Sequence, residues 1–240
     1  MKKHVFQIVG ILLITWVITA GFLFSENQKI PYEKRNIKVE DFQSVGVALS
    51  AKVYIEQASR CNLEIEAAPE VFDKIEIEVK NGKLSLRPEN NISNLKGDIT
   101  IWISAPDYES IGIAGSAEVL AESSVKLSDV TLKIAGSGTM NFEDLSSKEL
   151  EIKIAGSGKM VIAGEGGKEM EVSIAGSGDL DATGFKVDEF EGKISGSGDC
   201  RVYVTGELSS SIAGSGSVYY KGNPEVNSSI AGSGKVKSLE

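Results

Sequence analysis

Seven copies of one short phrase, Ile-Ala-Gly-Ser-Gly with small variations, hold the glycines and hydroxyls that could do chemistry in this 240-residue chain. Glycine loops can cradle phosphate, but the known ones open a helix, whereas a strand-like segment follows each copy here. Asp179 and Asp199 directly follow two copies, as in calcium-binding nonapeptide repeats. Those repeats have a far shorter period, and four other copies carry Thr, Lys or Ser there. We therefore expect no nucleotide, cofactor or metal at these phrases.

The domain that follows the leader lacks histidine, a residue on which many catalytic sites depend. The single histidine, His4, lies in an N-terminal leader, so the domain that follows can form neither a Ser-His-Asp triad nor a His-liganded metal site. Carboxylates are abundant, but none stands out from an ordinary solvated strand face. We predict no catalytic residue and no enzyme activity. The competing interpretation, a residual carbohydrate-active enzyme, requires carboxylates clustered along one face of the fold.

Three tyrosines near the C-terminal end form the candidate ligand surface: Tyr203, Tyr219 and Tyr220. An exposed aromatic stripe would point to glycan binding. The alternative is that these rings pack at the edge of a coil.

The spacing of the phrase predicts how these residues are positioned. Successive copies begin 21, 20, 20, 20, 18 and 18 residues apart. A period near 20 means that one small unit is stacked into a solenoid. Within a unit, Leu132 and Ile134 alternate with Thr131 and Lys133, which is the pattern of a strand with one buried face. Each unit is therefore one coil, and coils stack about 4.8 Å apart.

Stacking assigns a structural role to every position of the phrase. The isoleucine forms a buried ladder, glycine forms a corner or allows close approach of backbones, and serine forms a row of hydroxyls in which each can donate to the next. This ladder has seven isoleucines: Ile113, Ile134, Ile154, Ile174, Ile194, Ile212 and Ile230. The structural repeat residues of the three central copies are Ile134, Gly136, Ser137, Gly138, Ile154, Gly156, Ser157, Gly158, Ile174, Gly176, Ser177 and Gly178.

The predicted fold is all-β, a right-handed single-stranded β-helix with coils of about 20 residues. A left-handed β-helix is built from hexads. Here Gly206 and Pro224 occupy places where hexads need aliphatic residues, and the longer coils do not divide by six.

Residues 36–108 are also rich in strand signals. Asn81-Gly82 between two alternating runs predicts a hairpin, and a helical turn is expected only around residues 69–73. Val47 to Ala51 aligns with Ile113 to Ala117 as a degenerate copy of the phrase. We interpret 36–108 as the first coils, or a cap on them, and 109–240 as the repeat coils, within one domain over 31–240.

Residues 1–30 combine a basic start, an apolar run over 5–24 and a polar linker, which is typical of an export signal. Both a cleaved signal and an uncleaved signal anchor fit, and only the anchor would hold the chain to a membrane. The remainder carries 22 basic and 33 acidic residues. Such an acidic domain repels nucleic acid and anionic lipid. Its cysteines, Cys61 and Cys200, could be paired or free.

A family resemblance is carried by segments 42–47, 53–57 and 81–86, followed by the Ile-Ala-Gly-Ser-Gly coils. On these segments the chain resembles the bacterial head GIN domain family, described as putative auto-transporter adhesins. It covers about residues 36–237. The resemblance implies a right-handed β-helix similar to pectin lyases without their catalytic residues, a location in the cell envelope and a role in adhesion. It transfers no functional residue.

These observations together predict an exported, non-enzymatic protein of the periplasm, outer membrane or cell surface. Its expected role is that of an adhesin or binding module for an envelope or extracellular ligand, with glycans as one candidate. The alternative is a structural protein that assembles with copies of itself through an open last coil.

Overall fold

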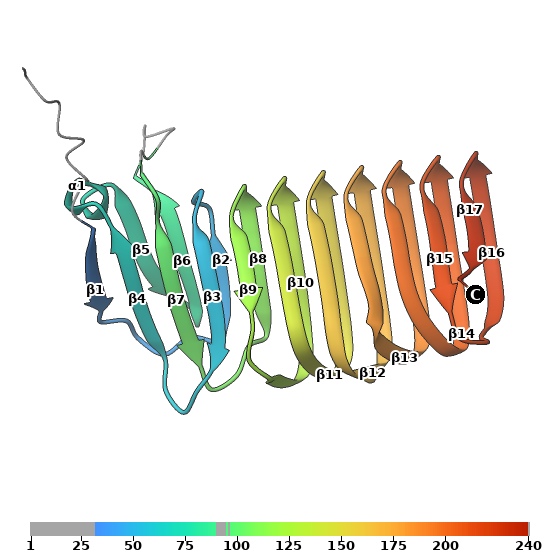
Figure 1. Ribbon diagram of the computed structural model, residues 1–240, viewed down its shortest axis with the longest axis horizontal. Coiled ribbons are helices and arrows are strands. Elements are labelled where there is room, and N and C mark those ends of the chain that lie inside the picture. Colours follow the sequence, from blue (N-terminus) through green and yellow to red (C-terminus); the bar gives the residue numbers. More distant parts are fainter. Residues whose placement is uncertain (1–31, 90–94, 96, 240) are drawn as a thin grey trace, which may run out of the picture. The chain divides into compact units, whose positions relative to one another are not determined.

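The computed structural model describes residues 32–89, 95 and 97–239. The expected export signal lies outside the described residues. Residues 31–240 form one compact unit, in which strands lie side by side in stacked coils (Figure 1). No helix in the described part of the chain is both long and apolar enough to span a bilayer.

The described residues of this unit form one short helix and seventeen strands. They are β1 (Glu33–Ile37), β2 (Ser44–Val47), β3 (Lys52–Gln57), β4 (Asn62–Ala67), α1 (Pro69–Phe72), β5 (Ile75–Lys80), β6 (Lys83–Pro88), β7 (Thr100–Ala105), β8 (Ser110–Gly115), β9 (Glu118–Ala121), β10 (Val125–Gly136), β11 (Thr139–Gly156), β12 (Lys159–Gly176), β13 (Asp179–Gly196), β14 (Asp199–Gly214), β15 (Ser217–Lys221), β16 (Glu225–Gly232) and β17 (Lys235–Ser238).

The repeats stack as parallel coils in the predicted register. Ile134 of β10 pairs with Ile113 of β8 and Ile154 of β11, and the same phrase is aligned in every later pair of coils. The fold is a β-solenoid of about six turns with coils of about 20 residues, which confirms the predicted fold class.

The N-terminal strands continue the same sheet. β2 pairs in parallel with β8 and places Val47 opposite Ile113, so the degenerate copy of the phrase is confirmed. β3 pairs with β9 in the same way. Towards the N-terminus the pairing turns antiparallel, in β4 with β7, β1 with β4 and β5 with β6. Asn81 and Gly82 both have positive φ and form the expected hairpin between β5 and β6.

The isoleucine ladder forms the centre of the core. Ile113, Ile134 and Ile154 are each at most 3% exposed, and burying such a side chain stabilises the fold by about 1.5–3 kcal/mol. The prediction was wrong for the last member, because Ile230 is 41% exposed. It lies in β16, which among the described residues has a coil on one side only.

The glycines have the expected geometric reasons. Gly136 has φ of 130°, and a Cβ there would lie 2.5 Å from the carbonyl oxygen of Gly115. The prediction for the serines was wrong in one respect, since their side chains are exposed and within the described chain no hydroxyl of the row donates to the next. Backbone hydrogen bonds connect these serines to the preceding coil instead. The Ser137 N–H, for example, donates to Gly115 O at 2.9 Å.

Candidate binding face

The outward side chains of β10–β14 and β16 form straight columns, because each coil repeats the register of the coil before it. Two outward positions on β10 are Asp129 and Lys133, and the residues between them on the inward side, such as Val130 and Leu132, are buried. Strand alternation therefore sends every second side chain into solvent. We call the four columns that start at residues 129, 131, 133 and 135 the columned face.

Each column has its own chemistry. The first is wholly acidic: Asp129, Glu149, Glu169, Glu189, Glu207 and Glu225. The second is acidic in its middle: Thr131, Glu151, Glu171, Glu191, Ser209 and Asn227. The third begins basic: Lys133, Lys153, Ser173, Lys193, Ser211 and Ser229. The fourth is small: Ala135, Ala155, Ala175, Ser195, Ala213 and Ala231.

The charges of the second and third columns partly neutralise one another. Lys153 Nζ lies 2.5 Å from Glu151 Oε1, and Lys193 Nζ lies 2.6 Å from Glu191 Oε1. A hydrogen bond from Lys153 is the main reason that the pKa of the Glu151 carboxyl lies below its usual value. The Thr131 hydroxyl, which donates to Glu151 at 3.0 Å, lowers this pKa further. The first column has no such partners among the described ion pairs. Like charges directly opposite on neighbouring strands are unfavourable, so this column is a site of unbalanced negative charge.

Four depressions lie along this same face. One of about 570 Å³ is lined mainly by carboxylates, among them Asp129, Glu149 and Glu169. A second of about 440 Å³ lies over the small column between Ala135 and Ala175. A third of about 190 Å³ lies at the C-terminal end of the face, and a fourth of about 490 Å³ lies at its N-terminal end over β2, β6 and β8.

The acidic columns were not predicted from the sequence. No carboxylate was expected to stand out from an ordinary solvated strand face, yet Glu149, Glu169 and Glu189 are 20 residues apart, which is the period of the coil. Combining that period with strand alternation would have predicted the column. The clustering that a carbohydrate-active enzyme requires is therefore present. A general acid, however, needs a raised pKa, and the pKa of Glu151 is shifted the other way.

The three candidate tyrosines do not share one face. Tyr219 and Tyr220 are neighbours on β15, so they point to opposite sides of the sheet. Tyr220 packs against the core, as the alternative interpretation held. Tyr203 and Tyr219 point outward on the other side of the solenoid, where Lys221 Nζ lies 5.6 Å from the Tyr203 ring and Arg201 Cζ lies 5.3 Å from the Tyr219 ring.

The structure also describes the two cysteines and the arrangement of the side chains that could bind a metal ion. Cys61 and Cys200 are free, and Cys200 is fully buried. Within the described part of the chain, no group of three or more His, Cys, Asp or Glu side chains is arranged to hold a metal ion.

One aromatic contact was not predicted from the sequence. Tyr54 and Trp102 stack with their ring centroids 5.9 Å apart.

Comparison with known proteins supports the fold. A family model described as "Putative auto-transporter adhesin, head GIN domain" matches residues 41–224. A putative adhesin from Bacteroides fragilis NCTC 9343 superposes with a TM-score of 0.81 at 22% identity, covering 87% of this chain and 97% of the other. A structure from Parabacteroides distasonis ATCC 8503 described as a putative lipid binding protein has a TM-score of 0.70 at 22% identity, covering 87% and 97%. The search of curated proteins finds no match.

Proposed function

Because the chain belongs to the family described as "Putative auto-transporter adhesin, head GIN domain", we propose that it is an exported, non-enzymatic adhesin of the bacterial cell envelope. The columned face is its binding surface, and an extended glycan is the first class of ligand to test. Its location in the periplasm, outer membrane or at the cell surface rests on the leader expected at residues 1–30.

The observation that carries this proposal is the register of the columned face. Each of the six coils of β10–β14 and β16 presents a carboxylate in the first column, and four depressions lie along the same surface. A polymer with repeating hydroxyls can donate to such a column at several coils. Many weak contacts then add up to useful avidity.

A glycan array probed with the purified chain tests the proposal. For any glycan that binds, the affinity of a triple variant, Glu149→Gln, Glu169→Gln and Glu189→Gln, is compared with that of the wild type. Hydrogen bonds to charged groups are worth about 1.5–3 kcal/mol, so the loss should be at least about tenfold.

The matched control removes three carboxylates outside the columned face. These are Glu143, Asp144 and Glu165, exposed residues in the bends of β11 and β12. Their amide variants should bind as the wild type does. Equal losses for both triple variants, or an array without a hit, would contradict the assignment of this face.

The same glycan distinguishes an adhesin from an enzyme. An adhesin releases its ligand intact, whereas a glycosidase uses paired carboxylates to cleave it. Mass spectrometry of the recovered glycan should show one unchanged species. Cleavage products that disappear in the triple variant would establish an enzyme instead.

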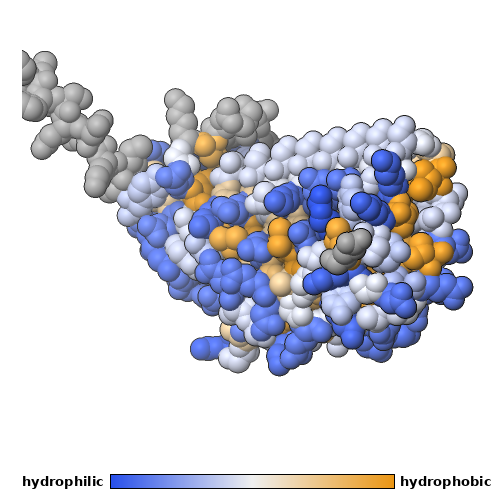
Figure 2. Space-filling view, turned by 45° about the vertical axis from the view of Figure 1, so that its right-hand side comes forward, coloured by the Kyte–Doolittle hydropathy of each residue, from blue (hydrophilic) through white to orange (hydrophobic). Residues whose placement is uncertain are grey.

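A second function, self-assembly, is favoured by the last described coil. Val226 and Ile230 of β16 are 39% and 41% exposed, and Figure 2 shows apolar surface at this end of the solenoid. Among the described strands, β16 and β17 are each paired along one edge only. Exposed edges of this kind can pair with another chain.

Sedimentation of the purified chain over a wide concentration range tests self-assembly. If the last coil docks on a second copy, the wild type sediments as a dimer or larger, and Ile230→Lys returns it to a monomer. A monomer at all concentrations would rule out assembly through this coil.

A further inference from the structure

The depression at the N-terminal end of the columned face differs from the rest in its charge. It occupies about 490 Å³ over β2, β6, β8 and β10. Its rim carries three basic side chains, Lys83, Arg87 and Lys133, in a chain with a net charge of −9. We call it the basic dish.

The floor of the basic dish includes two glycines, which have no side chains. Gly46 of β2 and Gly112 of β8 lie opposite each other in register, in the row that continues into the third column. Gly112 does not have positive φ, and a Cβ there would come no closer than 3.8 Å to any atom. A glycine inside a strand costs about 0.5–1 kcal/mol relative to alanine. Because the backbone does not require glycine at this position, its effect is to keep the dish open.

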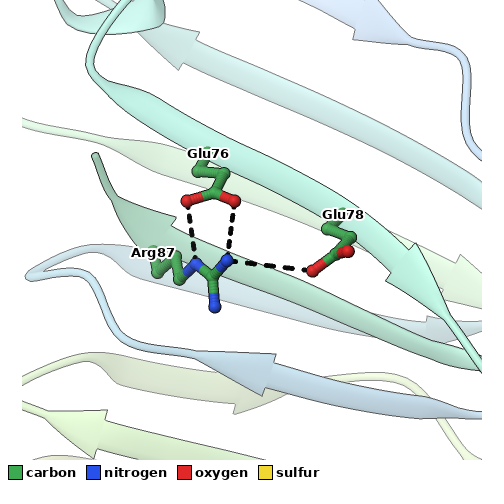
Figure 3. A network of polar contacts seen from close by, with 3 residues as sticks. All are labelled: Glu76, Glu78 and Arg87. Atoms are coloured by element: carbon green, nitrogen blue, oxygen red, sulfur yellow. Dashed lines mark hydrogen bonds and ion pairs between the residues drawn. The ribbon is translucent and has the colours of Figure 1, made fainter. Parts of the chain in front are cut away.

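Arg87 is fixed at the rim by carboxylates behind it. Its Nε and Nη2 donate to Glu76 at 2.9 and 2.6 Å, and Glu78 lies 3.8 Å from Nη2. Figure 3 shows that the third guanidinium nitrogen points away from both carboxylates. Nη1 takes part in none of these contacts, so the side chain is held in place with two N–H donors still available.

The two lysines are not neutralised by ion pairs. Within the described residues, neither Lys83 nor Lys133 has a carboxylate oxygen within 4 Å. The Lys83 side chain covers Gly46, with Cε and Nζ 3.0 and 3.5 Å from the position that a Cβ on Gly46 would take, and leaves Gly112 as the open part of the floor. Lys133 bounds the opposite side of Gly112. Two ammonium groups without a carboxylate oxygen within 4 Å and one oriented guanidinium therefore surround a recess that can receive an oxyanion.

We propose that the basic dish binds the carboxylate of an acidic sugar that ends an otherwise neutral glycan. Ser44, Ser85 and Ser110 also line the dish and can exchange hydrogen bonds with sugar hydroxyls. The acidic first column then accepts hydrogen bonds from the neutral part of the glycan, so this inference rests on the proposed function. An anionic bilayer suits the site less, because the adjacent acidic columns would be repelled by it.

The test compares two glycans that differ in one acidic sugar, 3′-sialyllactose and lactose. We expect the purified chain to bind 3′-sialyllactose at least about tenfold more tightly, as one charged hydrogen bond allows. The double variant Lys83→Gln, Lys133→Gln should lose this preference. The control variant Lys235→Gln, Lys237→Gln, which removes the same two charges from exposed positions of β17, should keep it.

A third variant separates shape from charge. Gly112→Val fills the floor with a β-branched side chain that suits a strand, and it removes no charge. Its far-UV circular dichroism should match that of the wild type and its melting temperature should be at least as high, while its affinity for 3′-sialyllactose falls to that for lactose.

Three results would overturn the inference. One is equal affinity for the two glycans, and another is an acidic preference that survives both the lysine and the glycine variants. The third is lysine-dependent binding to phosphatidylglycerol vesicles without binding to 3′-sialyllactose, which would identify a membrane as the partner. If lactose-type glycans still bind through the first column, the proposed function stands although the basic dish does not.

Discussion

Replacing Gly176 with alanine should destabilise the solenoid strongly, whereas the same change at Gly112 should stabilise it slightly. Gly176 has φ of 119°, and a Cβ there would lie 2.5 Å from the carbonyl oxygen of Gly156 in the preceding coil. Gly112 has neither a positive φ nor a close neighbour. The pair of variants thus separates the glycines that the coil geometry requires from those that it does not.

The expected magnitudes follow from these contacts. A residue other than glycine held at such a φ costs about 1–3 kcal/mol. Relief of the clash would move the Gly156 carbonyl, which accepts the Ser177 N–H at 2.8 Å, and that loss adds about 1 kcal/mol. Gly176→Ala should therefore lower the free energy of unfolding by about 2–4 kcal/mol. Gly112→Ala should raise it by about 0.4–1 kcal/mol, because alanine restricts the unfolded chain.

Thermal unfolding followed by circular dichroism measures both effects. In a domain of this size 1 kcal/mol shifts the Tm by about 2–4 °C, so Gly176→Ala should lower the Tm by roughly 5–15 °C. A Gly176→Ala variant as stable as the wild type, or a Gly112→Ala variant that is the less stable of the two, would refute the assignment of the phrase glycines to backbone contacts.

Three further predictions concern the core, one ion pair and one thiol. Ile154→Ala should cost about 2–5 kcal/mol in urea unfolding, while Ile230→Ala should cost much less because that side chain is 41% exposed; equal costs would contradict the ladder. The Glu151–Lys153 pair stabilises the fold above the pKa of the unfolded carboxyl, and this contribution is lost as the pH falls through the lowered folded pKa. Lys153→Met should therefore raise the pKa of Glu151 in an NMR titration, and an unchanged pKa would exclude the pair as its cause. Burial raises the pKa of the Cys200 thiol, so iodoacetamide should modify Cys200 only on unfolding. The half-buried thiol of Cys61 is removed by Cys61→Ser, and rapid labelling of Cys200 in this native variant would show that thiol to be accessible.

The interior of the solenoid could be predicted because it is periodic. One side chain per coil, the isoleucine of the phrase, must fall above its equivalent, and this condition also identified Val47 as a member of the row. The exception, Ile230, shows the limit of that reasoning: periodicity specifies which way a residue faces, but burial also needs a neighbouring coil on each side.

The exterior was harder to predict. Its features depend on which side of the strand each side chain points to, and on the side chains that neighbouring coils place beside it. Tyr219 and Tyr220 are adjacent in sequence but lie on opposite faces of β15. The acidic column joins residues 20 positions apart, such as Glu149 and Glu169, which lie outside the Ile-Ala-Gly-Ser-Gly phrase. The basic dish needs Lys83, which a hairpin brings beside β2, and no repeat in the sequence marks that contact.

The central claim is that the columned face binds the ligand. Its most direct test is the affinity of one array-selected glycan for the triple variant in Glu149, Glu169 and Glu189. The control is the triple variant in the bends of β11 and β12. We predict a loss of at least about tenfold for the first and wild-type affinity for the second. Wild-type affinity in the first variant would contradict the claim.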